Sequence, residues 1–100
     1  MQVKAMGMVW YRQEDYQRCK AMFTDGSKLA DTFDEWLTAA QTGYDKFDRQ
    51  GMKVVKAYID PDTFPEWCRT HHQETNAQGR GAFANECAYL KFSPDAQHES

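Results

Sequence analysis

Two short runs of β-forming residues, separated by a long helical stretch, constrain the fold more than any other feature of this chain. Met6–Tyr11 and Met52–Ile59 are both rich in β-branched and aromatic side chains. Roughly 40 residues lie between them, enough for a crossover connection between parallel strands. The crossover should then be right-handed. Because two strands alone make a marginal sheet, either the first residues or a second copy of the chain should complete it.

The connection between the two runs carries helical periodicity. Apolar residues recur at intervals of three and four along Gln13–Phe23, which predicts a short amphipathic helix. A longer helix is expected from Thr32, which forms a capping box with Glu35. An apolar stripe follows along Phe33–Phe47, and Gly51 is placed to end the helix in a left-handed conformation.

Two further helices are expected after the second strand. The turn Asp60–Asp62 contains proline, and Thr63–Glu66 repeats the capping box, so a helix should run from there to about His72. Polar residues fill Gln73–Gly81, and helical periodicity resumes in Ala82–Phe92.

One hexapeptide occurs twice in nearly the same form. Asp31–Trp36 and Asp62–Trp67 differ at one position in six, but their flanking sequences do not align. We interpret the match as repeated capping chemistry in preference to a duplicated unit.

These elements predict an α+β fold in which about four helices cover a two- or three-stranded sheet. The 41% apolar and 14% aromatic content is enough for one core without disulfides. We expect residues 1–100 to form a single domain. Residues 1–7 are interpreted as a leader or flexible segment, and 93–100 as a frayed tail.

Composition disfavours several classes of function. A net charge of −3 gives no positive field for nucleic acid. The longest apolar runs are far short of the roughly 20 residues that span a bilayer. Cys19, Cys68 and Cys87 are an odd number at wide spacing, which indicates reduced thiols and a cytoplasmic protein.

One cluster has the residue types of a metal or thiol site. Cys68, His71 and His72 fall on one predicted helix, where thiolate and imidazole at three- or four-residue spacing can reach one zinc ion. A closed site would need two more ligands, for which the candidates are Cys19, Cys87 and His98. The sequence favours the alternative of a buried thiol beside solvated histidines, so no metal or other cofactor is expected.

Asp60 and Asp62 follow a strand and precede a helix, where many α/β proteins place ligand-binding groups. Carboxylates at a helix entrance also cap the helix and favour its dipole without any ligand, and this second interpretation is preferred.

Aromatic residues on the first strand point to an interface. Val9, Trp10 and Tyr11 lie on a terminal strand, which is expected at a sheet edge, and aromatic side chains are enriched in protein interfaces. Trp36 and Trp67 occupy matched helical positions and are expected in the core.

Several short segments carry a resemblance to other proteins. The chain resembles small uncharacterised bacterial proteins at Val54–Val55, Phe64 and Trp67–Cys68, and also at two longer segments, Thr32–Trp36 and Ile59–Asp62. This resemblance covers about the middle third and implies no activity or catalytic residue.

The expected function is non-catalytic binding of a protein partner or of the chain's own copy, as a homodimer through an edge strand. A small metal- or thiol-dependent enzyme centred on Cys68, His71 and His72 is an alternative. An acidic regulator or inhibitor from a mobile element is another.

Overall fold

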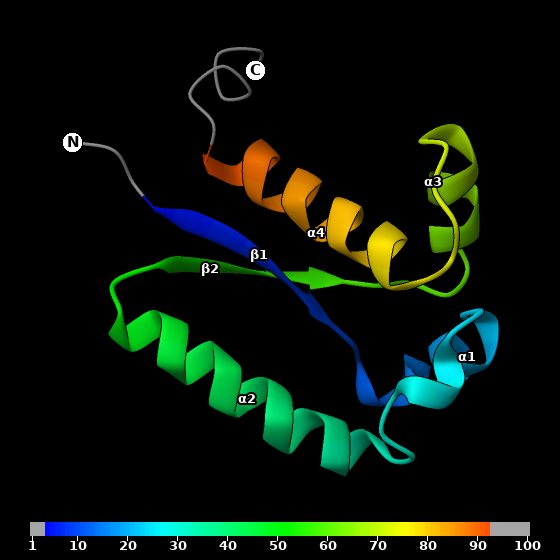
Figure 1. The fold of residues 1–100 in the computed structure, drawn as a ribbon, viewed down its shortest axis with the longest axis horizontal. Coiled ribbons are helices and arrows are strands. Elements are labelled where there is room, and N and C mark those ends of the chain that lie inside the picture. Colours follow the sequence, from blue (N-terminus) through cyan, green and yellow to red (C-terminus); the bar gives the residue numbers. More distant parts are fainter. Residues whose placement is uncertain (1–3, 93–100) are drawn as a thin grey trace.

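In the computed structural model, which describes residues 4–92, the two β-forming runs pair as a two-stranded parallel sheet (Figure 1). Strand β1 spans Ala5–Trp10 and β2 spans Lys53–Tyr58. Their register places Ala5 opposite Lys53 and Trp10 opposite Tyr58. Within this part of the chain four α-helices accompany the sheet, which confirms the predicted α+β fold with the smaller of the two expected strand numbers.

Of the two expected flexible ends, residues 1–7 and 93–100, the structure describes only residues 4–7. Residues 1–3 and the expected frayed tail, 93–100, lie outside the described residues. Ala5, Met6 and Gly7, which fall in the segment predicted to be a leader or flexible, belong to β1.

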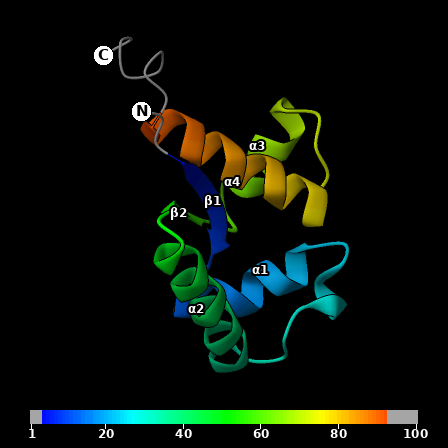
Figure 2. The ribbon, with the colours of Figure 1, turned by 60° about the vertical axis from the view of Figure 1, so that its left-hand side comes forward.

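Two long helices cover opposite faces of the sheet. Figures 1 and 2 show α2, Phe33–Arg49, on one side of the strands and α4, Ala77–Phe92, on the other. Side chains alternate between the faces of a strand. Gly7 faces α4, whereas Met8 and Trp10, two residues apart, both face α2.

The predicted ends of α2 are confirmed. The side-chain oxygen of Thr32 accepts the backbone N–H of Glu35 at 3.2 Å, which satisfies one free donor of the first turn. At the other end Gly51 has a φ of 85°, and the N–H of Met52 donates to the carbonyl of Phe47 at 3.2 Å. This is the left-handed glycine cap that the sequence predicts.

Two short helices lie near the carboxyl ends of the strands. A 3₁₀ turn, Gln13–Asp15, leads into α1, Tyr16–Met22, and a second turn, Gly26–Lys28, follows it. Helix α3 spans Phe64–Thr70. The main buried cluster forms here, and its members are Tyr11, Tyr16, Cys19, Phe23, Ile59, Phe64 and Cys68.

The predicted capping box at the start of α3 is wrong. The side chain of Thr63 makes no capping hydrogen bond. The carbonyl oxygen of Asp60 instead accepts the N–H of Phe64 at 2.9 Å, and the carboxylate of Glu66 pairs with Arg69. The repeated hexapeptide therefore encodes a cap at its first occurrence and a different turn at its second.

Helix α4 begins at Ala77, five residues before the predicted start at Ala82, and so includes the last part of the polar segment Gln73–Gly81. Its first turn is capped from two sources. Asn76 Oδ1 accepts the N–H of Gly79 at 3.0 Å, and Asp25, 52 residues earlier in the chain, accepts the N–H of Ala77 at 3.0 Å. A contact of such long range leaves no signal in local periodicity.

Candidate functional site

The backbone of β1 presents hydrogen-bonding groups on two sides. The carbonyl of Trp10 accepts the N–H of Ile59 at 3.0 Å, so the even-numbered residues of β1 bond to β2. Successive strand residues direct their N–H and C=O groups to opposite sides. The odd-numbered residues therefore direct theirs away from β2, and they are Ala5, Gly7 and Val9. Within residues 4–92 no strand pairs with this free edge, because the sheet has only two strands.

The two free edges of the sheet differ in charge. β1 has the sequence Ala-Met-Gly-Met-Val-Trp, with no charged residue. β2 carries Lys53 and Lys56 among its six residues. Lysine on an edge strand discourages pairing with another chain, and β1 has no such protection.

An open hollow lies beside the first half of β1, beneath the second half of α4. Its volume is about 340 Å³, and it is lined by Ala5, Met6, Gly7, Asn85, Ala88, Tyr89 and Phe92. None of these seven residues has a charged side chain, and Asn85 contributes a side-chain amide. We call the free edge of β1 together with this hollow the β1 edge surface.

Helix α4 approaches β1 very closely at one position. A Cβ atom built on Gly7 would lie 1.9 Å from the carbonyl oxygen of Ala84. Only glycine fits this contact, which brings the helix backbone down onto the strand. Further along α4, Tyr89 is 52% exposed, so α4 carries a large unburied side chain next to the edge.

The predicted interface residues of β1 lie largely inside the protein. Trp10 is 4% exposed and packs edge-to-face on Trp36 of α2, with ring centroids 5.2 Å apart. Tyr11 is 3% exposed, and its burial raises the pKa of its phenol. Val9 is half-buried. The side chains of Trp10 and Tyr11 thus belong to the core, and Val9 packs against it. The N–H and C=O groups of Val9 face the free edge.

Cys68, His71 and His72 do not converge. The Cys68 thiol is 2% exposed and donates to the carbonyl of Glu74 at 3.6 Å. His71 caps the end of α3, whereas His72 has a φ of 56° and is exposed. Among residues 4–92 no group of three or more His, Cys, Asp or Glu side chains is arranged to hold a metal ion.

His71 instead joins α3 to α4. Its ring stacks on Trp67 with centroids 4.0 Å apart, and its Nε2 lies 3.3 Å from the carboxylate of Glu86. The indole N–H of Trp67 donates to the same carboxylate at 2.8 Å. Because Nδ1 of His71 also lies 2.8 Å from the carbonyl of Trp67, both ring nitrogens already have partners. This arrangement is typical of a structural link.

The thiols are held in their protonated form. Burial raises the pKa of Cys19 to about 12 and also raises the pKa of Cys68. Burial and the neighbouring Glu86 raise the pKa of Cys87. The third predicted extra ligand, His98, lies outside the described residues. Since a nucleophilic cysteine needs a lowered pKa, these positions suit packing better than catalysis.

Asp60 and Asp62 shape the turn before α3. Asp60 Oδ1 accepts the N–H of Asp62 at 2.8 Å, and the carboxylate of Asp62 pairs with Arg18 at 2.5 Å. The latter pair is exposed to solvent. Both carboxylates are thus engaged in local contacts of the kind that the preferred capping interpretation implies.

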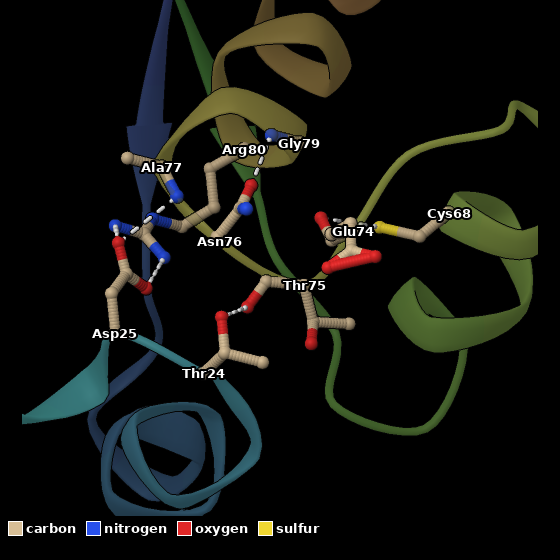
Figure 3. A network of polar contacts seen from close by, with 9 residues as sticks. All are labelled: Thr24, Asp25, Cys68, Glu74, Thr75, Asn76, Ala77, Gly79 and Arg80. Atoms are coloured by element: carbon tan, nitrogen blue, oxygen red, sulfur yellow. Dashed lines mark hydrogen bonds and ion pairs between the residues drawn. The ribbon is translucent and has the colours of Figure 1, made fainter.

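A polar network fastens the loop after α1 to the start of α4 (Figure 3). The guanidinium of Arg80 binds the Asp25 carboxylate through two hydrogen bonds of 2.8 and 3.1 Å. Arg80 also lies over the ring of Phe23, and Thr24 donates its N–H to the carbonyl of Thr75 at 2.9 Å. Arg80 lowers the pKa of the Asp25 carboxyl group, so the pair stays charged at neutral pH.

The part of α4 that lines the hollow, above all Asn85 and Tyr89, is not predicted by the sequence. The only signal in the sequence is that apolar residues of Ala82–Phe92 occur on more sides than one packed face requires.

No protein-family model, curated protein or solved structure matches the chain. No helix within residues 4–92 combines the length and apolar character needed to cross a membrane.

Proposed function

We propose that this chain is a small non-catalytic protein-binding domain that binds its partner through the β1 edge surface. In this mode of recognition an extended segment adds a strand to an exposed sheet edge. Main-chain hydrogen bonds supply affinity, and neighbouring apolar surface supplies selectivity.

One observation carries the proposal: β1 offers an uncharged, unpaired edge next to a hollow whose lining side chains carry no charge. Parallel sheets usually have more strands and helices on both faces. Here both faces are covered by α2 and α4, yet every residue from Ala5 to Val9 remains only half-buried. An additional strand at this edge would bury more of β1 and fill part of the hollow.

The enzyme alternative has less support. It requires Cys68, His71 and His72 to act together, and they point into different environments. The raised pKa of Cys68 disfavours a thiolate nucleophile. The acidic-regulator alternative rests on the small size of the chain and its net charge of −3.

The three cysteines are free, with Cys19 and Cys68 buried and Cys87 half-buried. Such thiols persist in a reducing compartment, and the proposal therefore places the domain in the cytoplasm.

The proposal can be tested by capture from a lysate of the native host on the immobilised full-length chain. The informative variant is Ala5→Pro, because the N–H of Ala5 faces away from β2 and its loss removes no bond within the sheet. Leu90→Lys is the matched control, since Leu90 is 59% exposed and does not line the hollow.

We expect at least one protein, the chain itself included, to be retained by the wild type and by Leu90→Lys but lost with Ala5→Pro. Equal retention by all three proteins, or retention by none, would contradict binding at this edge. Circular dichroism should show that each variant is folded.

A further inference from the structure

We infer that the partner at the β1 edge surface is a second copy of this chain, whose β1 pairs antiparallel with β1 of the first copy about a twofold axis at Gly7. This inference rests on the proposed function and names its partner. The two copies would form one four-stranded sheet with helices on both faces.

The backbone geometry of β1 suits such pairing. In an antiparallel ladder, two opposite residues exchange hydrogen bonds only if both direct their N–H and C=O groups at each other. Ala5, Gly7 and Val9 all face the free edge. With the axis at Gly7, the two Gly7 residues pair with each other, and Ala5 of each copy pairs with Val9 of the other.

Charge selects β1 over β2 for self-pairing. Like charges placed opposite one another destabilise a strand pair. Two copies of β1 bring no charges together along the six residues of the strand. Two copies of β2 would bring Lys53 and Lys56 of both chains to one ladder.

The exposed face of α4 has matching symmetry. The helix meets β1 at Gly7 through Ala84, and the next residue, Asn85, lines the hollow beside β1. The proposed axis is therefore placed beside Asn85. Gly81 and Tyr89 lie four residues before and after Asn85, and they share its side of the helix. Antiparallel copies of α4 would therefore place Tyr89 of one opposite Gly81 of the other.

The sizes of these two residues are complementary. The ring of Tyr89 is 52% exposed, whereas a Cβ atom at Gly81 would have no heavy atom within 4 Å. A large unburied side chain would thus meet an open position. None of the three residues of this face, Gly81, Asn85 and Tyr89, is charged.

An extended segment of an unrelated protein could use the same edge, but it would not use the symmetry of α4. Tyr89 and Gly81 therefore distinguish a second copy from a foreign strand.

Sedimentation equilibrium of the purified full-length chain, from low to high micromolar concentration, tests the inference. We expect a monomer–dimer equilibrium in the wild type. Ala5→Pro should be monomeric throughout, and Tyr89→Lys should raise the dissociation constant at least about tenfold by placing charge in the apolar contact. Leu90→Lys, which adds the same charge one residue away on another side of the helix, should dimerise like the wild type.

A wild-type chain that stays monomeric across this range would overturn the inference. So would a dimer that Leu90→Lys weakens and that Ala5→Pro and Tyr89→Lys leave intact. Neither result would by itself overturn the proposed function. If Ala5→Pro abolishes capture of a different protein, binding at the edge is still supported. Thermal unfolding of each variant at low concentration shows whether its monomer is folded.

Discussion

At Gly7 the backbone of α4 lies directly against β1. A side chain there would meet the carbonyl of Ala84 at 1.9 Å, a contact with the backbone that no rotamer relieves. Residues further along α4, between Asn85 and Phe92, line the hollow beside β1. Gly7 therefore links the packing of the fold to the surface proposed for binding.

Gly7→Ala should destabilise the fold. Overpacking of a close contact typically costs about 1–3 kcal/mol, and here the helix must move away from the strand. Gly81→Ala is a suitable comparison, because its Cβ meets nothing and alanine favours a helix interior by roughly 0.5–1 kcal/mol. Chemical denaturation at low protein concentration should give opposite signs for the two variants. An unchanged midpoint for Gly7→Ala would contradict the described packing.

The cysteines allow a second prediction at this scale. Because burial raises the pKa of Cys19, Cys68 and Cys87, all three should resist a thiol-specific reagent such as Ellman's reagent at neutral pH. Labelling should be slow in the native protein and immediate in denaturant. Rapid native labelling of Cys68 would revive the thiol-enzyme alternative.

At the scale of elements, α4 depends on a contact that crosses the chain. Asp25 caps its first N–H group and pairs with Arg80, and both side chains are largely buried. Asp25→Asn retains an acceptor but loses the charge, and it should lower the free energy of unfolding by about 2 kcal/mol at neutral pH. Asp62→Asn, in an exposed pair with Arg18, should change it little.

The contribution of Asp25 should depend on pH. Arg80 lowers the pKa of this carboxyl group in the folded state. The stability that it adds is therefore fully present above the ordinary aspartate pKa of about 4 and is lost as the pH falls through the lowered folded-state value. Denaturation of the wild type and Asp25→Asn should converge in acid. A difference that persists or widens below this range would contradict the assignment.

Local chemistry explains which elements the sequence predicts. β1, α2 and β2 were predicted within a few residues, because their periodicity, the Thr32 cap and the Gly51 stop all act through near neighbours. The start of α4 was missed because Asp25 lies 52 residues away. At Thr63 the second copy of the hexapeptide follows a different turn, and the Thr63 side chain makes no capping hydrogen bond.

The candidate site was predicted only in part, for a related reason. The sequence placed β1 at an edge but could not show that Trp10 packs against α2, since that contact depends on how the helix crosses the sheet. The prediction that Val9, Trp10 and Tyr11 form an interface stays a prediction, now limited to the backbone at Val9.

At the scale of the whole molecule, burial is uneven. The main core gathers near the carboxyl ends of the strands, where Tyr16, Ile59 and Phe64 are almost fully buried. The amino-terminal half of the sheet is half-buried and adjoins the hollow. The well-buried end of the sheet thus stabilises the fold, and the partly buried end carries the surface proposed for binding.

Amide hydrogen exchange along β1, measured residue by residue at low and high protein concentration, is the sharpest test of pairing at the free edge of β1. The N–H groups of Met6, Met8 and Trp10 bond to β2 and should be protected at both concentrations. Those of Ala5, Gly7 and Val9 should exchange freely at low concentration and become protected at high concentration, where a second copy pairs with the edge. If these three amides are equally protected at both concentrations, or equally unprotected at both, pairing of two copies at this edge is contradicted.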